Sequence, residues 1–398
     1  MFLGDLGQSN RGLGAYRAAS AVLHESVHHF ERLVADDLFR HGSPYADTLV
    51  SLGTCLWELG QPRAGLERMT TAVATCRLLA GQASDPQPLA LVRALHGQAV
   101  MLRDLGQVQH ALAADEEALG LLTRVAESNS DELGLLRAEV LLDLGLSLRS
   151  ANRSMEALTH LADAVETVRE AARTRNNYLP ILGRGLAILG ACLCDVGRVA
   201  QALAADEEAV AIRRALVRRH PERHLHDLAT SLHDLGVNRR NVSRYDEALT
   251  ALREAVEIMR AVVGSAPGRY GGKLPFFLDN LAIGLLRTGH LDEALTTIEE
   301  AVRTYEILAE EEPDRYLPEL AGALGTLADV NAHLPAPGDS VTALRKAVTV
   351  WQVCARNDPK THDSAYQRAR TRLTESLARS GRETEAANVA LSPDSSRG

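Results

Sequence analysis

The sequence predicts an all-α solenoid of about nine antiparallel helix pairs. Small or turn-forming residues recur at a nearly constant step along the 398-residue chain, and the apolar residues between them keep helical spacing. The recurring positions, which we call anchors, are Gly60, Gly106, Asn152, Gly197, Ser243, Gly289, Pro335 and Gly381. They lie 45 or 46 residues apart. A period in this range indicates a stack of similar units.

The first helix of each unit comes before the anchor. The residue eight before the anchor is leucine in all units but one, as at Leu144 and Leu235. The next residue is usually glycine or alanine, as at Gly145 and Gly236. A repeated leucine indicates a core position, and a repeated small residue indicates that two helices approach each other closely.

The second helix follows the anchor. Its apolar marks lie five, six, twelve and thirteen residues after the anchor, as in Ala157–Leu158 and Ala164–Val165. The anchor then lies between two helices, where glycine or asparagine adopts the left-handed conformation that ends the first one. Pro335 cannot adopt it, so the turn within Ala332–Ser340 should be built differently.

Two further marks repeat near the junctions between units. Prolines that are 46 residues apart indicate where the second helix stops. These are Pro221, Pro267, Pro313 and Pro359. Ring-bearing residues also step by 46, at Tyr178, His224, Tyr270, Tyr316 and His362. We expect these rings to pack between neighbouring units and not to form a ligand-binding ladder.

No linker interrupts the period, so we expect one continuous solenoid over residues 1–391 and a polar disordered tail over residues 392–398. The first unit is anchored near Gly14 and begins inside its first helix. Solenoids need solubilising caps at their ends. We therefore expect either a preceding domain or a first unit that docks on something, including self-association.

One unit carries a family resemblance in the residues Leu189-Gly190, Leu193, Gly197, Ala202-Leu203, Ala209 and Pro221. This pattern resembles the tetratricopeptide repeat, whose usual unit is about 34 residues. The longer unit is similar to the repeats of kinesin-light-chain type and to regular actinobacterial arrays with openings like Tyr178-Leu179-Pro180. The resemblance implies a right-handed superhelix whose first helices line a concave groove for a peptide or helix.

Composition bounds the class of partner. The formal net charge of −9 and the pI near 5.9 give no general attraction to nucleic acid or to an anionic membrane. We found no apolar run near eighteen residues and no secretion signal at the start, and we expect a cytoplasmic protein. The five cysteines form no disulfide framework. Cys55 and Cys192 share an offset with Ser147, which favours a packing role over metal binding.

One enzymatic motif occurs, at His24-Glu25-Ser26-Val27-His28, which has the H-E-x-x-H spacing of zinc hydrolases. Val27 is the core valine of its repeat, so the motif lies on an ordinary second helix. His29 and His41 are the candidate third ligands. We interpret the motif as incidental surface histidines and expect no cofactor; phosphate-loop and nucleophile-elbow motifs are absent from the sequence.

Two rows of residues at equal offsets are the candidate partner-binding site. Three residues before the anchor lie Trp57, Arg103, Arg149, Cys194 and Arg240, and nine before it lie Asp143, Asp234 and Asn280. Arginines fork onto carboxylates, and Asp or Asn side chains bind peptide backbone groups. Asn280 alone has the residue type that kinesin-light-chain repeats carry there. The alternative is that both rows are the solvated or salt-bridged side of the first helices.

The acidic runs Asp115-Glu116-Glu117 and Asp206-Glu207-Glu208 lie on second helices, where we expect a solvated convex face with a structural role.

The main expectation is a non-catalytic scaffold that holds a partner segment of acidic character in the groove between Asp47 and Phe277. Two alternatives stay open. One is the sensor or regulatory part of a larger signalling NTPase or transcription regulator, and the other is a zinc hydrolase at His24 and His28.

Overall fold

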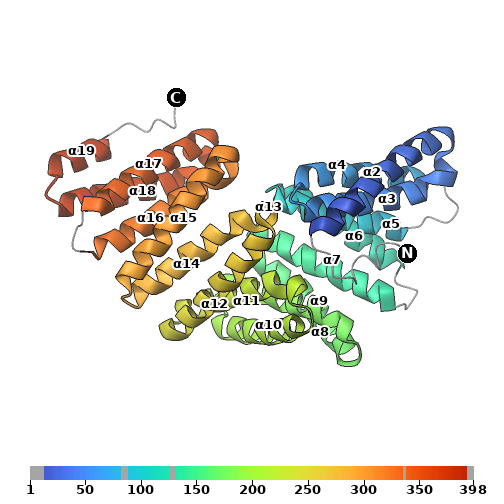
Figure 1. Cartoon of the computed structure of the whole chain (residues 1–398), viewed down its shortest axis with the longest axis horizontal. Helices are drawn as coiled ribbons and strands as arrows, with labels where there is room; N and C mark the ends of the chain where they lie inside the picture. The colour runs from blue at the N-terminus through green and yellow to red at the C-terminus, as the bar shows by residue number, and fades with distance from the viewer. Residues whose placement is uncertain (1–12, 82–87, 126–130, 335–337, 392–398) are drawn as a thin grey trace. The chain divides into compact units, whose positions relative to one another are not determined.

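The computed structural model describes residues 13–81, 88–125, 131–334 and 338–391, which are helical with no strand among them. The Cα trace divides into two compact units, unit 1 (Met1–Asp234) and unit 2 (Leu235–Gly398). Within each unit the helices follow one another as packed pairs (Figure 1). The prediction of an all-α solenoid of helix pairs is confirmed.

The helices of unit 1 have the lengths that the period predicts. They are α2 (Leu13–Asp36), α3 (Leu38–Glu58), α4 (Pro62–Ala80), α5 (Pro88–Asp104), α6 (Val108–Val125), α7 (Asp131–Ser150), α8 (Ser154–Thr174), η1 (Asn176–Tyr178), α9 (Leu179–Asp195) and α10 (Val199–Arg219). Helix α11 (Pro221–Asn241) begins in unit 1 and ends in unit 2.

Unit 2 continues the same alternation. Its helices are α12 (Tyr245–Ser265), α13 (Pro267–Tyr270), η2 (Gly271–Lys273), α14 (Leu274–Arg287), α15 (Leu291–Glu311), α16 (Pro313–Ala332), α17 (Gly338–Asn357), α18 (Pro359–Arg379) and the short α19 (Glu383–Leu391). The predicted tail and the opening of the first unit before Leu13 lie outside the described residues.

The first helices of successive repeats touch one another. In unit 1, α3 contacts α5, α5 contacts α7 and α7 contacts α9, and in unit 2 α14 contacts α16. The second helices α4, α6, α8 and α10 have no comparable contact with each other in the described part of the chain. Helices that lie closer together are on the inner side of a bent stack. We call the surface of α3, α5, α7 and α9 the first-helix face of unit 1.

The anchors adopt the predicted left-handed backbone. Five glycine anchors have φ between +73° and +79°, and the two described anchors with a side chain, Asn152 and Ser243, have φ of 59° and 62°. The amide that follows each anchor closes the helix by bonding a carbonyl of its last turn, as Arg153 does with Leu148 at 2.8 Å. Pro335 lies outside the described residues. Gly14 is an exception, because it falls within α2 and not before it.

The repeated prolines begin the next helix as well as ending the previous one. Pro221, Pro267, Pro313 and Pro359 are each the first residue of a helix. The missing amide hydrogen of proline would have no partner in that position. The residue before each proline is extended, with φ between −131° and −145°, because the proline ring disfavours helical backbone there.

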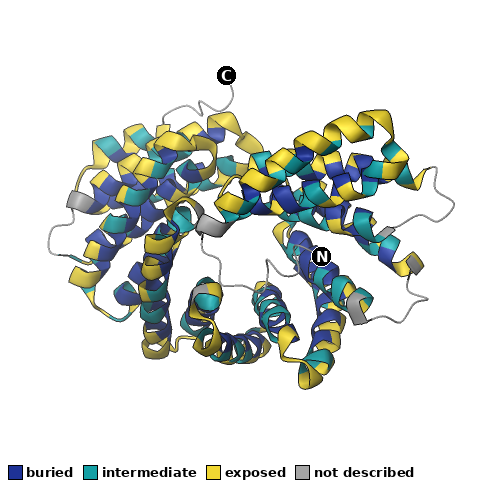
Figure 2. Cartoon of the chain, turned by 45° about the vertical axis from the view of Figure 1, so that its right-hand side comes forward, coloured by how far each residue is buried: buried dark blue, intermediate teal, exposed yellow. Residues whose placement is uncertain are grey.

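The core lies between the helices and repeats with them. Leu144 is 3% exposed and Leu161 is fully buried. A Cβ on Gly145 would lie 2.5 Å from the Leu161 side chain, so a small residue is needed there. Buried residues line the inside of each pair and exposed residues line the outside (Figure 2). Predicted ring contacts are present at Tyr316, whose centroid lies 6.4 Å from that of Tyr305, and at His362, whose centroid lies 5.8 Å from that of Trp351.

Ion pairs tie the second helices together across neighbouring repeats. Arg77 of α4 pairs with Glu117 of α6 at 2.6 Å, and Arg169 of α8 pairs with Glu208 of α10 at 2.9 Å. In unit 2, Arg253–Glu293, Arg260–Glu300 and Arg345–Glu385 follow the same pattern. These long side chains span second helices that lie farther apart than the first helices, and we call the pairs the outer rungs.

One segment, Asn176–Asp195, has the length and composition of a membrane span, with a mean hydropathy of 1.4 over its most apolar window. The expectation that no such run exists was therefore wrong. Half of that window is buried inside the protein, because α9 is a core helix of the repeat stack. Core helices of soluble proteins meet the same criterion.

Candidate functional site

Two carboxylates occupy core positions of the repeat. Nine residues after the anchor most units have a large apolar residue, as at Met69, Leu161 and Leu252. Asp115 and Asp206 take that position after Gly106 and Gly197 and are 0% and 2% exposed. The prediction that the acidic runs are solvated was wrong for these two residues. It holds for Glu116, Glu117 and Glu207, which are exposed.

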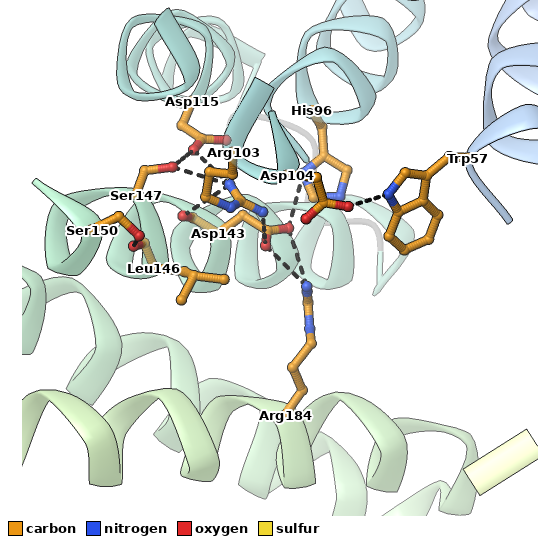
Figure 3. A network of polar contacts seen from close by, with 10 residues as sticks. All are labelled: Trp57, His96, Arg103, Asp104, Asp115, Asp143, Leu146, Ser147, Ser150 and Arg184. Carbon is orange, nitrogen blue, oxygen red and sulfur yellow. Dashed lines mark hydrogen bonds and ion pairs between the residues drawn. The ribbon is translucent and has the colours of Figure 1, made fainter. Parts of the chain in front are cut away.

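Arg103 connects Asp115 to the next repeat (Figure 3). Its Nη1 donates to Asp115 Oδ2 at 3.2 Å and to Ser147 Oγ at 3.0 Å, and its Nη2 donates to Asp143 Oδ1 at 2.8 Å. Ser147 Oγ in turn donates to Asp115 Oδ2 at 2.6 Å. The Arg103 side chain is only 9% exposed. This guanidinium therefore joins α5, α6 and α7 from the inside.

Basic side chains of two other helices lie against Asp143. Arg184 of α9 donates to its two oxygens at 3.0 and 3.2 Å, and His96 of α5 lies 3.3 Å from Oδ2 (Figure 3). Burial by itself would raise the pKa of Asp143, but Arg184, His96 and Arg103 together hold it at about 2. Asp143 therefore stays charged at neutral pH and joins three successive first helices.

For Asp115, the effect of burial on the pKa outweighs the effect of the neighbouring cation. Burial raises its pKa to about 7, although Arg103 and the hydrogen bond from Ser147 oppose the rise. Its Oδ1 is buried and has no hydrogen-bond partner. Asp143 satisfies much of the Arg103 guanidinium, so less of the Arg103 charge is left to stabilise an Asp115 carboxylate. The sequence predicted neither the burial nor this pairing.

The two predicted rows pair with each other across repeats. Arg103 meets Asp143, and Arg240 meets Asn280, each over a separation of 40 residues. Arg240 donates from Nη1 to the Asn280 carbonyl and from Nη2 to its Oδ1, both at 3.2 Å. The Asn280 amide nitrogen donates to the Phe276 carbonyl at 3.1 Å. These contacts agree with the salt-bridged alternative for the rows, and contact with a partner stays a prediction.

The other members of the rows have partners of different kinds. Trp57 Nε1 donates to Asp104, and Arg149 Nε donates to Asp195 Oδ2 at 2.8 Å. Both side chains of the Arg149–Asp195 pair are more than a third exposed. Asp234 lies 3.1 Å from the buried ring of His233. The two rows thus join repeats mainly through charges and hydrogen bonds.

A second buried cation was not anticipated from the sequence. Arg213 of α10 is 6% exposed and takes a position where other units have Leu122, Val168 or Met259. Its Nη1 donates to Ser231 Oγ at 2.6 Å and to the carbonyl of Asp227. The signal was present in the aligned repeats, as a charged residue at an apolar offset.

The H-E-x-x-H motif lies on the surface of α2. Val27 is 4% exposed, as the repeat predicts. His24 Nδ1 lies 2.8 Å from the Ser20 carbonyl, and His28 lies 3.6 Å from Glu31. No group of three histidine, cysteine or acidic side chains with metal-binding geometry occurs among the described residues. The zinc hydrolase alternative has no geometric support.

Half-buried apolar side chains run along the first-helix face of unit 1. Val100, Leu146 and Ala191 each lie six residues before an anchor and are partly exposed. Arg184 and Glu139, thirteen residues before their anchors, are also half-buried. This face therefore presents an apolar row beside charged groups, which suits an elongated ligand with both kinds of side chain.

The helix pairs, their constant period and the paired rows define an α-solenoid repeat protein. A family model described as tetratricopeptide repeat matches residues 184–261, and one described as anaphase-promoting complex subunit 5 matches residues 14–144 and 236–317. The model described as anaphase-promoting complex subunit 5 matches more than half of the chain, so the chain belongs to that family, and its repeats are tetratricopeptide repeats. No curated protein matches the sequence.

Solved structures share the fold at low identity. The apo form of the quorum sensor NprR from B. thuringiensis matches with 11% identity over 95% of each chain and a TM-score of 0.58. A Rap protein complexed with competence and sporulation factor matches with 16% identity, 88% of this chain, 90% of that chain and a TM-score of 0.51. A signal transduction ATPase with a tetratricopeptide repeat sensor, from Pyrococcus horikoshii, matches with 13% identity and a TM-score of 0.52. That match covers 83% of this chain and 46% of the ATPase.

Proposed function

We propose that this protein is a non-catalytic scaffold that binds a segment of another protein along its first helices. The observation that carries the proposal is the row of half-buried Val100, Leu146 and Ala191 on three successive first helices, each in contact with the next. Apolar side chains left partly exposed at the same offset in successive repeats give a binding surface of repeating chemistry. The second helices present charged outer rungs instead.

The network behind this row supports the same function. Asp143 and Arg103 are almost fully buried and join α5, α6 and α7, so the apolar row rests on a rigid base. A preformed surface loses little conformational entropy when a ligand binds. Arg103 has an internal role in this proposal. Arg149 and Arg184 are half-exposed and paired with Asp195 and Asp143, so they contribute charged groups beside the apolar row.

Site-specific photo-crosslinking tests the proposal. A photoreactive residue is placed at Val100, Leu146 or Ala191 on the first helices, and at Glu116 or Glu207 on the second helices as matched controls. After irradiation in native lysate, we expect one protein species to be crosslinked from the first-helix positions and not from the controls. Crosslinks from the control positions alone would place the binding surface on the other side and refute the proposal.

The regulatory alternative uses the same surface. A tetratricopeptide array can serve as the sensor of a signalling ATPase, as it does in the signal transduction ATPase from Pyrococcus horikoshii. The two proposals differ in the rest of the polypeptide. If this chain is a sensor, the gene should encode a nucleotide-binding domain in frame with it, and partner binding should change the rate of nucleotide hydrolysis.

A further inference from the structure

In unit 1 each arginine three residues before an anchor meets a carboxylate of the next repeat. Arg103 is held by Asp143, which lies nine residues before the next anchor. Arg149 is held by Asp195, which lies two residues before the next anchor. The carboxylate that pairs with the arginine therefore lies either nine or two residues before the next anchor.

Arg240 has a carboxylate at neither offset. The residue nine before the next anchor is Asn280, a neutral amide, and the residue two before it is Arg287, a second cation. Both hydrogen bonds from Arg240 to Asn280 are 3.2 Å long, compared with 2.8 Å for the charged bond from Arg103. Hydrogen bonds between two charged groups are shorter and stronger than bonds to a neutral acceptor. The junction after Arg240 thus has an excess of positive charge.

Nearby groups offset this charge only in part. Burial lowers the pKa of Arg240, Asp279 opposes that shift, and Arg287 adds to it. Asp279 also has a hydrogen bond with Thr326, and burial raises its own pKa. Arg287 is exposed, and no described residue forms an ion pair with it. A half-buried guanidinium beside an exposed one favours an anion from outside.

We propose that Arg240 and Arg287 form a subsite that binds the side-chain carboxylate of an aspartate or glutamate in the partner segment. This inference rests on the proposed function and adds the chemical class recognised in unit 2. A carboxylate accepts hydrogen bonds from two guanidinium groups at once through its four lone-pair directions. It would supply from the partner the charge that Asp143 and Asp195 supply within unit 1.

The probes for the test are two synthetic libraries of random peptides, one with Asp and Glu and the other with Asn and Gln in their place. Retention on the immobilised full-length protein is measured by mass spectrometry. We expect the wild type to favour the acidic library about tenfold, which corresponds to about 1.4 kcal/mol. Asn280→Asp gives Arg240 an internal carboxylate, and Arg287→Gln removes the second cation. Each should reduce the preference to near unity.

Ser150→Asp is the matched control. It adds the same charge as Asn280→Asp, at the offset two before an anchor, in a junction where Arg103 already has Asp143. It should leave the preference unchanged, and circular dichroism confirms that all variants are folded. An acidic preference that persists in both variants would overturn the inference. Equal retention of both libraries by the wild type would overturn it and leave the proposed function intact. Retention of neither would overturn both.

Discussion

Arg103 donates a hydrogen bond of 2.8 Å to Asp143, a residue 40 positions later in the chain. The pair is almost completely removed from water. Arg184 reaches the same carboxylate from the following repeat. A residue that two arginines share in this way stabilises three repeats, so its loss should have effects beyond its own helix.

Replacing Asp143 by alanine leaves Arg103 buried with Asp115 as its remaining carboxylate and also removes the carboxylate that Arg184 contacts. We expect a loss of about 3 to 5 kcal/mol in unfolding free energy, the range for breaking a buried ion pair. Asp195→Ala is the matched control, because its pair with Arg149 is exposed and should be worth at most about 1 kcal/mol. Urea unfolding followed by circular dichroism measures both, and equal losses would contradict the assignment.

The position of the destabilised helices in Asp143→Ala provides a second test of the same assignment. Repeats are stabilised by their neighbours, so the effect should decrease with distance along the stack. Hydrogen exchange should speed up most in α5, α7 and α9 and least in α17 and α18. Uniform acceleration along the chain would mean that Asp143 does not act through its local contacts.

Asp115 should make stability depend on pH in an uncommon direction. Its folded pKa of about 7 is above the ordinary value of 3.8, so the folded state holds the proton more tightly. The stabilisation is full below pH 3.8 and is lost as pH rises toward 7. Between about pH 5 and 8 the wild type should lose about 2 to 3 kcal/mol relative to Asp115→Asn.

Asp143 makes stability depend on pH in the opposite direction. Its effect occurs in a lower pH range than that of Asp115, so the two effects can be measured separately. Its folded pKa of about 2 is below the ordinary 3.8, so its contribution is present above pH 3.8 and is lost as pH falls through 2. Urea titrations of wild type and Asp115→Asn at about pH 5 and pH 8 therefore report on Asp115 alone. Parallel pH curves for the two proteins would show that Asp115 is charged throughout.

Ser243 has a left-handed backbone with φ of 62°. That conformation is strained for a residue with a Cβ, so Ser243→Gly should stabilise the protein by about 0.5 to 1 kcal/mol. Gly197→Ser is the opposite exchange at an equivalent anchor, and it should destabilise by a similar amount. A Cβ on Gly197 would meet no atom within 4 Å, so backbone strain alone is measured. Thermal unfolding of both variants checks the prediction, and shifts of the same sign would refute it.

Cys76 and Cys192 should react slowly with alkylating reagents. Cys192 is fully buried, and burial raises its pKa to about 11; the Cys76 pKa is also about 11, from burial and the nearby Asp47. Few thiolates exist at about pH 8 under these conditions. We expect iodoacetamide to modify these thiols far more slowly in the native protein than in urea, as measured by mass spectrometry of peptides. Rapid native labelling of Cys192 would show that α9 opens readily.

The sequence predicted the turns well because their cause is local. Asn152 and Ser243 take the place of glycine in an unbroken period, and the left-handed turn needs no knowledge of the rest of the fold. The pairing of the rows depends on contacts between repeats. A period fixes the offset of Arg103 and Asp143 and does not say that they meet. The equal separation of 40 in Arg103–Asp143 and Arg240–Asn280 was the available signal.

The burial of Asp115 was missed for another reason. It stands at the start of an acidic run whose other two members are exposed, so composition suggested a solvated surface. The aligned repeats hold the correction, since Leu161 and Leu252 occupy the same offset. A charged residue at an offset where other repeats have leucine indicates a buried charge with a partner. The partners could not be chosen from sequence, because Arg103 and Ser147 come from two different helices.

The two sides of unit 1 should respond differently to force. The first helices touch and are tied by short bonds shielded from water, whereas the outer rungs Arg77–Glu117 and Arg169–Glu208 are solvated and weakened by salt. Stretching the array would therefore separate the second helices before the first. The stack therefore acts as an asymmetric spring. Ionic strength sets the stiffness on the side of the second helices, and buried ion pairs set it on the side of the first helices.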